Sequence, residues 1–188
     1  MLIRTIEEKD IPQIASIHFR YLKVGILSAL GESFLGIFYK SFMGNSNTFT
    51  LVVVDDSKIV GFASGATNLK TILKATILSL WFPVMITVIK KPNIFAKLAQ
   101  TPFYPSFKSG QNFGEIFSLA VVPSARGKGI GTKLIKACQI EFKKRGYNHF
   151  RLSVREKMQE ANIFYQKLKL KKKGSARFLN EKIIFYGN

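Results

Sequence analysis

The segment from residue 115 to residue 145 constrains the fold of this chain more than any other. An apolar run, Glu115–Val122, leads into a turn that contains Gly127, Gly129 and Gly131, and the turn opens an amphipathic run. Glycines leave the backbone free of side-chain bulk, so successive N–H groups can surround an anion. A helix that begins at the same turn adds unpaired N–H groups and the positive end of its dipole. The segment therefore predicts a strand, a phosphate-binding turn and a helix.

Strand and helix patterns alternate only in part along the rest of the chain. β-Branched runs predict strands, and apolar residues spaced three and four apart predict helices. The predicted strands cover residues 2–6, 48–54, 59–66, 115–122, 149–154, 172–178 and 182–186. The predicted helices cover residues 11–22, 32–43, 130–145 and 159–168. This order predicts one α/β domain over residues 1–188 with a mixed sheet.

Residues 69–111 interrupt this pattern. Ala75–Ile89 carries no charge over 15 residues and has Pro83 in its middle. A helix of that length would span roughly 22 Å, less than the roughly 30 Å core of a bilayer, and proline favours two short helices over one. We therefore expect a helical insert at about 69–111 rather than a membrane span. An oligomer interface, a wall of a substrate cleft and docking of residues 69–100 on an anionic membrane stay open.

The formal net charge of +18 is unevenly distributed. Residues 126–188 hold 17 Lys and Arg against 4 Glu, whereas residues 1–125 hold 12 against 7 acidic residues. Such a field attracts polyanions, among them a nucleotide cofactor, a nucleic acid or an anionic membrane. A nucleic-acid partner is disfavoured because the lysines are not interleaved with exposed aromatic residues or a recognition motif. The single cysteine, Cys138, excludes an internal disulfide, and no signal run is visible, so we expect a cytoplasmic protein.

The spacing of the glycines excludes two common phosphate sites. A P-loop needs Lys and then Ser or Thr after its last glycine, an order that Lys128 and Thr132 do not follow. A dinucleotide fingerprint needs a third glycine where Thr132 stands. The run from Arg126 to Gly131 instead resembles the acyl-CoA loop of the GNAT superfamily of N-acetyltransferases. The pattern of that loop is Gln/Arg-x-x-Gly-x-Gly/Ala at a strand-to-helix junction.

A second signature lies downstream of the loop. The run Ala161-Asn-Ile-Phe-Tyr165 resembles the Ala-x-x-Phe-Tyr helix of the superfamily, and the order of elements matches over the chain apart from the insert. The pattern departs where Lys169 and Leu170 replace a glycine and an aromatic residue, and where Met158 replaces a frequent asparagine. The resemblance implies a mixed, mostly antiparallel twisted sheet of about seven strands flanked by helices, with the insert at about 69–111.

The resemblance also implies acetyl-CoA as co-substrate. Pantetheine would pair with the backbone of a strand that splays from its neighbour, and the loop amides would bind the pyrophosphate. Arg126 and Lys128 would add charge-assisted contacts to phosphate. The implied cofactor contacts are Leu119, Ala120, Val121, Arg126, Gly127, Lys128, Gly129, Ile130, Gly131, Thr132, Asn162 and Tyr165.

Direct transfer of an acetyl group from a thioester to a primary amine needs a neutral amine, a donor to the oxyanion and a proton for the thiolate. The resemblance places Tyr165 near the thioester sulfur as proton donor, and Glu115 at the start of the strand as general base. A backbone N–H of that strand would bind the oxyanion. We expect His18 and His149 to be structural. No His, Cys and Asp cluster has the spacing of metal ligands, so no metal is expected.

Two other classes of function stay open. One is a catalytically inactive acyl-CoA-binding sensor, which the departures at Met158, Lys169 and Leu170 favour. The other is a basic nucleic-acid-binding protein. No motif identifies the acceptor, but the positive charge favours a neutral or anionic small-molecule amine, such as an amino sugar, over a polyamine or a basic peptide. A homodimer is also left open.

Overall fold

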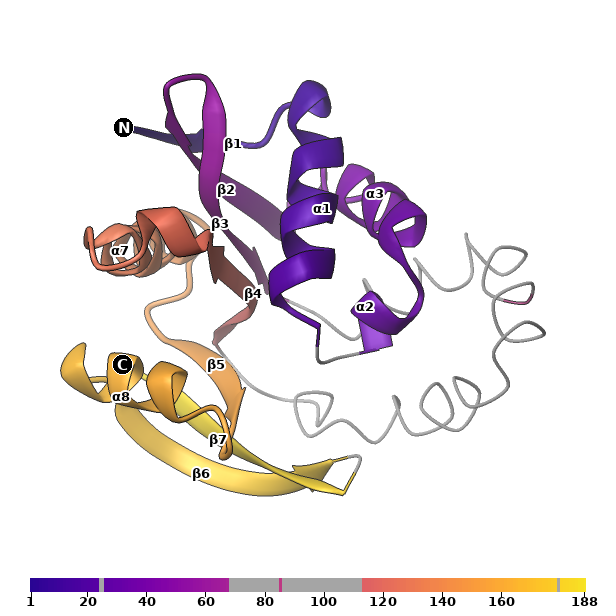
Figure 1. Cartoon of the computed structure of the whole chain (residues 1–188). Helices are drawn as coiled ribbons and strands as arrows, with labels where there is room; N and C mark the ends of the chain where they lie inside the picture. The colour runs from indigo at the N-terminus through magenta and orange to yellow at the C-terminus, as the bar shows by residue number, and fades with distance from the viewer. Residues whose placement is uncertain (24–25, 68–84, 86–112, 179) are drawn as a thin grey trace.

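The computed structural model describes residues 1–23, 26–67, 85, 113–178 and 180–188 (Figure 1). A seven-stranded sheet runs through it in the order β1-β2-β3-β4-β5-β7-β6. Its strands are β1 (Leu2–Thr5), β2 (Thr48–Asp55), β3 (Lys58–Ala66), β4 (Gly114–Val121), β5 (Phe150–Arg155), β6 (Lys171–Phe178) and β7 (Glu181–Gly187). Neighbouring strands are antiparallel except β4 and β5, which are parallel. The predicted α/β class with a mixed, mostly antiparallel sheet is confirmed.

Helices cover both faces of this sheet (Figure 1). They are α1 (Ile11–Tyr21), α2 (Ile26–Ala29), α3 (Glu32–Lys40), α7 (Ile130–Lys144) and α8 (Gln159–Lys167), with 3-10 turns η1 (Glu8–Asp10) and η4 (Pro123–Ala125). Each strand and helix predicted outside 69–111 is present, and its ends differ by at most three residues. Helix α2 was not predicted. The expected helical insert and the expected membrane contact through 69–100 lie outside the described residues, apart from Met85.

The alternation of side chains along β2 divides the core into two layers. Val52 points toward α1 and α3, whereas Leu51 and Val53 point toward α7. Such alternation is what a strand with both faces covered requires. Cys138 of α7 is buried in the second layer, where it packs as a small core residue.

Strands β4 and β5 pair over only three residues. Gly114–Ile116 of β4 faces Phe150–Leu152 of β5. Beyond that point β4 follows β3 as far as Val121, while β5 follows β7. The two strands therefore splay apart as predicted, and they leave a V-shaped opening whose vertex lies at the last paired residues.

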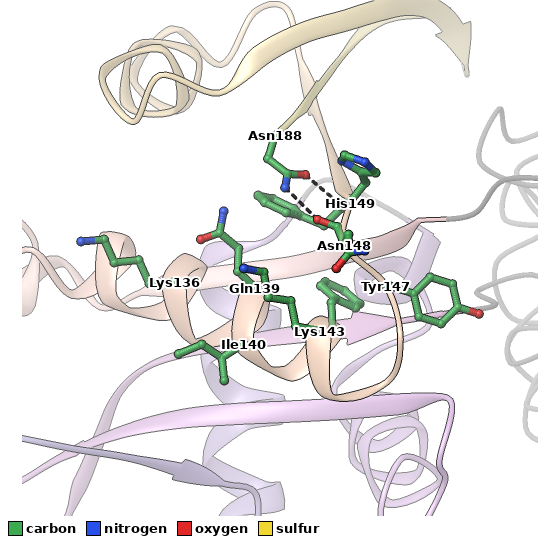
Figure 2. A pocket seen from close by; sticks show the side chains of 10 residues that line it. Lys136, Gln139, Ile140, Lys143, Tyr147, Asn148, His149 and Asn188 are labelled. Carbon is green, nitrogen blue, oxygen red and sulfur yellow. Dashed lines mark hydrogen bonds between the residues drawn. The ribbon is translucent and has the colours of Figure 1, made fainter.

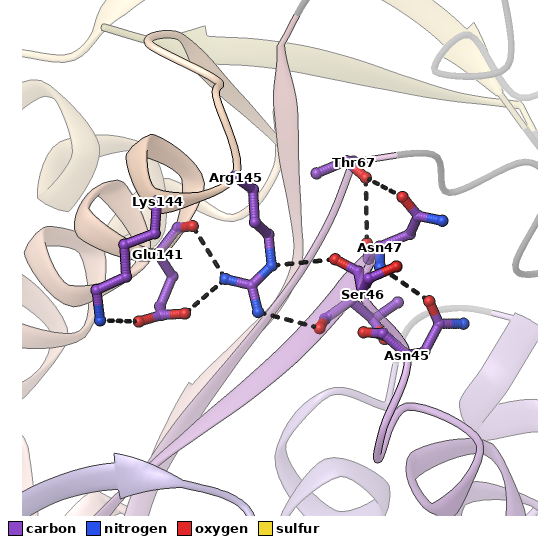
Figure 3. Close-up of polar contacts among 8 residues, drawn as sticks. Asn45, Ser46, Asn47, Thr67, Glu141, Lys144 and Arg145 are labelled. Carbon is purple, nitrogen blue, oxygen red and sulfur yellow. Dashed lines mark hydrogen bonds and ion pairs between the residues drawn. The ribbon is translucent and has the colours of Figure 1, made fainter.

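Arg145 ties the end of α7 to the loop before β2 (Figure 3). Its Nη1 donates to the Glu141 carboxylate at 2.5 Å, and its Nε donates to the carbonyl oxygen of Ser46 at 3.2 Å. The guanidinium carbon lies 4.9 Å from the centroid of the Phe49 ring. Burial opposes ionisation of Glu141, but the hydrogen bonds from Lys144 and Arg145 outweigh it and hold the pKa of this carboxyl below its usual range. The network fixes the C-terminal end of α7 to the start of β2.

Candidate functional site

A cleft of about 880 Å³ lies where β4 and β5 have separated. The end of β4, the glycine turn, the first turn of α7 and the region of α8 form its walls, and the end of α1 closes one side. The lining residues are Tyr21, Leu22, Leu119, Ala120, Val121, Ala125, Arg126, Gly127, Gly129, Ile130, Gly131, Thr132, Lys157, Met158, Gln159, Glu160, Ala161, Phe164, Tyr165 and Lys167.

The glycine turn has the backbone conformation that the sequence predicts. Gly127 and Gly129 have φ of 77° and 73°, in the left-handed region where a β-carbon is strained. Gly129 is also the N-cap of α7, and no side chain caps this helix end. The first N–H groups of α7 are therefore available to an anion, which the helix dipole also favours.

Ten of the twelve implied cofactor contacts line the cleft; Lys128 and Asn162 do not. Lys128 is exposed on the turn. The Asn162 side chain is engaged within the protein, since its amide nitrogen donates to the carbonyl oxygens of Met158 at 2.8 Å and Arg155 at 3.0 Å. Its Oδ1 accepts from the Tyr186 hydroxyl at 3.1 Å. We therefore assign Asn162 to holding α8 against the sheet, rather than to a contact within the cleft.

Arg126 and Tyr165 lie on different walls of the cleft. The Nε of Arg126 donates to the carbonyl oxygen of Val121 at 3.2 Å, so this side chain folds back across the turn. The Tyr165 ring is buried against Phe164 and Tyr186, with centroid separations of 5.2 Å and 5.7 Å. Burial raises the pKa of the Tyr165 phenol above its usual range, so the hydroxyl stays protonated at neutral pH.

Glu115 lies at the other end of β4, outside the lining of this cleft. It is buried, and its Oε2 lies 3.5 Å from Nη2 of Arg151. The two residues face each other in register across the short parallel pairing of β4 with β5. The structure thus places Glu115 next to the vertex of the V, within the paired part of the strands, and Tyr165 in the wall of the open end.

The two histidines differ in their surroundings. His18 belongs to α1 and is buried, and its Nδ1 lies 2.5 Å from the Tyr39 hydroxyl oxygen. Burial lowers the pKa of His18 to about 4, so the ring is neutral at physiological pH. His149 lines a separate cavity of about 320 Å³ between α7 and the C-terminus (Figure 2). There Asn188 donates to the carbonyl oxygen of Asn148 at 3.0 Å.

The sequence analysis missed one wall of the cleft. Tyr21 and Leu22 belong to the end of α1, and no motif marks them. Phe164 could have been found, because it stands beside Tyr165 in the Ala-x-x-Phe-Tyr run. Lys157 precedes α8 and Lys167 is its last residue; both add positive charge, which suits a polyanionic ligand.

The described part of the chain contains no group of three His, Cys, Asp or Glu residues that could hold a metal ion. Among the helices of that same part, none has the length and apolarity needed to cross a bilayer.

The sheet, its splayed strands and the glycine turn together define a GNAT-type fold. Residues 13–169 match the model of the acetyltransferase (GNAT) family, and the chain belongs to this family. A search of curated protein sequences found no match.

Solved structures show the same fold. An N-acetyltransferase from Staphylococcus aureus Mu50 superposes with a TM-score of 0.72 at 18% identity, with both chains covered in full. A ribosomal-protein-alanine N-acetyltransferase from Brucella melitensis gives 0.64 at 18% identity, covering 100% of this chain and 99% of its own. The yncA protein of Salmonella typhimurium, solved with its cofactor acetyl-CoA, gives 0.63 at 14% identity, with coverages of 100% and 92%.

Proposed function

We propose that the protein is an N-acetyltransferase that moves an acetyl group from acetyl-CoA directly to a primary amine of a small molecule. One observation carries this proposal: a single cleft joins the uncapped glycine turn to the opening between β4 and β5, and Tyr165 lies in its wall. Family membership supports the same reaction. An enzyme that uses acetyl-CoA is expected to act in the cytoplasm.

The residues present fit the parts of acetyl-CoA. The glycine turn and the first N–H groups of α7 would hold the pyrophosphate, and Arg126, Lys157 and Lys167 would add positive charge. Leu119, which has no partner on β5, offers backbone groups to the pantetheine amides on the open side of β4. The co-substrate supplies an activated thioester; the protein supplies position, protons and a dry site.

Tyr165 and Glu115 divide the proton transfers. As the amine nitrogen bonds to the carbonyl carbon and the carbon–sulfur bond breaks, Tyr165 donates its proton to the thiolate sulfur. Its buried, protonated phenol is suited to that role. Glu115, on the strand that leads to the loop, accepts a proton from the amine, directly or through water.

The test is the release of free thiol from acetyl-CoA in the presence of a panel of primary amines. Tyr165→Phe should lower kcat by about 100-fold, the lower end expected for loss of a general acid, with little change in KM for acetyl-CoA. Tyr186→Phe is the matched control, because this neighbouring phenol binds Asn162 and does not line the cleft. Tight binding of acetyl-CoA without thiol release from any amine would contradict the proposal and support the sensor function instead.

A further inference from the structure

Arg151 carries a guanidinium that is stacked between two aromatic rings. Its central carbon lies 4.6 Å from the centroid of Phe113 and 4.4 Å from that of Phe185. Only 11% of the side chain is exposed, and its Nη2 makes a long contact of 3.5 Å with Glu115. The buried Nε has no hydrogen-bond partner among the described residues. A buried guanidinium with an unpaired donor lowers the stability of the fold, so its presence in a native protein suggests a functional role.

The position of Arg151 connects it with the proposed reaction. Arg151 and Glu115 are register partners one position before the last paired residues of β4 and β5. Their neighbours Leu152 and Ile116 point into the core beneath α7. Because side chains alternate along a strand, Arg151 and Glu115 point to the opposite face. Because the strands separate directly beyond these neighbours, Arg151 and Glu115 lie at the closed, inner end of the opening between β4 and β5.

We infer that Glu115 and Arg151 together bind the acceptor as a zwitterion, and that the acceptor is an α-amino acid. This inference rests on the proposed transferase function. The carboxylate of the ligand faces Arg151 and its ammonium group faces Glu115. The nearest charged atoms of the pair are 3.5 Å apart, which matches a ligand that carries its amine and its carboxylate on one carbon.

The chemistry of the two side chains supports this class of ligand. Arginine presents its donors as a planar fork that binds carboxylates through two parallel hydrogen bonds. The rings of Phe113 and Phe185 hold the plane of that fork and shield it from water, which strengthens the interaction.

The proton balance is consistent with this arrangement. Of the two protons that the ammonium group loses, one passes to Glu115 and is released to solvent. The other replaces the proton that Tyr165 gives to the thiolate sulfur. The products are the N-acetyl amino acid and coenzyme A, and no further reactant is needed.

The experiment compares amino acids with the amines that lack only their carboxylate, for example phenylalanine with phenethylamine and leucine with isoamylamine. Thiol release from acetyl-CoA gives kcat/KM for each. We expect the amino acid to be preferred by about 10- to 100-fold, the equivalent of one hydrogen-bonded charge pair. Arg151→Gln should remove that preference, because kcat/KM falls much further for the amino acid than for the amine, through a higher KM for the amino acid. The aminophosphonic acid of the same spacing tests whether phosphate-type anions use the site equally well, which would overturn the assignment to amino acids.

Two further variants separate binding from folding. Arg151→Lys keeps the charge but not the fork, so it should restore only part of the preference. Arg155→Gln changes an arginine on the same strand and the same face that is paired with Glu181, and it should leave the preference unchanged. If Arg151→Gln does not fold, the preference of the native protein still decides the matter.

Equal kcat/KM for an amino acid and its amine would overturn the inference, as would an equal loss for both in Arg151→Gln. Absence of thiol release with every amine would instead contradict the proposed function. In that event calorimetry with leucine and isoamylamine, in the presence of coenzyme A, tests the site alone; no binding of leucine would overturn the inference independently.

Discussion

A β-carbon at Gly131 would lie only 2.9 Å from Cζ of Phe164, so α7 and α8 meet at this pair without room for a side chain. Phe164 also lines the cleft, directly before Tyr165. The contact therefore sets the distance between the proposed phosphate-binding turn and the wall that carries the proposed acid.

Gly131→Ala should weaken acetyl-CoA binding more than it destabilises the fold. The ring of Phe164, which lines the cleft, would have to shift, at a cost of about 0.5–1.5 kcal/mol for a strained rotamer. We expect the Kd for acetyl-CoA to rise by about tenfold, the equivalent of roughly 1.4 kcal/mol. Calorimetry measures the binding and a thermal melt measures the stability.

Two variants control this prediction. Gly131→Ala combined with Phe164→Leu should regain most of the affinity, because the smaller side chain leaves room for the methyl group. Gly36→Ala in α3 is the matched helical change, since the nearest atom to its β-carbon is 3.9 Å away, and it should leave Kd unchanged. An unchanged Kd for acetyl-CoA in Gly131→Ala would contradict the prediction, because it would show that the Phe164 side chain can move aside without narrowing the cleft.

Gly129→Glu should abolish acetyl-CoA binding while the protein remains folded. Its backbone has φ of 73°, which costs a non-glycine residue about 1–2 kcal/mol, and the new carboxylate would repel phosphate. Gly44→Glu is a matched control with φ of 75° and equally open surroundings, at a residue that does not line the cleft. Both variants should lose similar stability by circular dichroism, but only Gly129→Glu should lose binding. Retained binding in Gly129→Glu would place the pyrophosphate elsewhere.

The glycine turn could be predicted from the sequence because the residues that determine it are close together in the chain. Gly127 and Gly129 need left-handed φ, and Val121 before them and Leu134 after them belong to periodic runs. The same holds for Tyr165, whose neighbours repeat a helical pattern. The positions of such residues can be predicted, because short-range spacing in the sequence determines the helices and strands that carry them.

The partner of Glu115 could not be predicted in this way. Arg151 lies 36 residues further along the chain, and only the parallel pairing of β4 with β5 brings the two together. Asn162 shows the opposite case: it stands three residues from Tyr165, yet its side chain turns to the carbonyl oxygen of Arg155. That orientation follows from the packing of α8 on the sheet, which no local pattern reveals.

Arg145→Ala should destabilise the fold by about 2–3 kcal/mol, because it removes hydrogen bonds to a charged group and leaves Glu141 with fewer partners. The loss should show in urea denaturation. Arg145→Lys keeps the charge but cannot reach Glu141, Ser46 and Thr48 together, so it should recover less than half of the loss. Lys144→Ala removes the exposed partner of Glu141 and should cost under about 1 kcal/mol. Equal losses for Arg145→Ala and Lys144→Ala would refute a special role for Arg145.

His18 should make the stability of the protein depend on acidity. Its pKa is lowered by burial from 6.5 to about 4 in the folded state, so the unfolded chain binds the proton more readily. The stability that the neutral ring provides is complete above pH 6.5 and is lost as the pH falls toward 4. At 1.36 kcal/mol per unit, the loss amounts to roughly 3 kcal/mol.

The measurement is urea denaturation of the native protein and of His18→Gln at pH 7.5, 5.5 and 4.5. Carboxyl groups titrate in both proteins, so their contributions cancel in the difference. Glutamine can keep a hydrogen bond to Tyr39 but takes up no proton, and the advantage of the native protein should shrink by roughly 2–3 kcal/mol across this range. His149→Gln, a change at the exposed second histidine of the chain, should retain the full pH dependence of the native protein. If the free energy of unfolding differs between the native protein and His18→Gln by the same amount from pH 7.5 to 4.5, protonation of the buried His18 ring does not cause the loss of stability in acid.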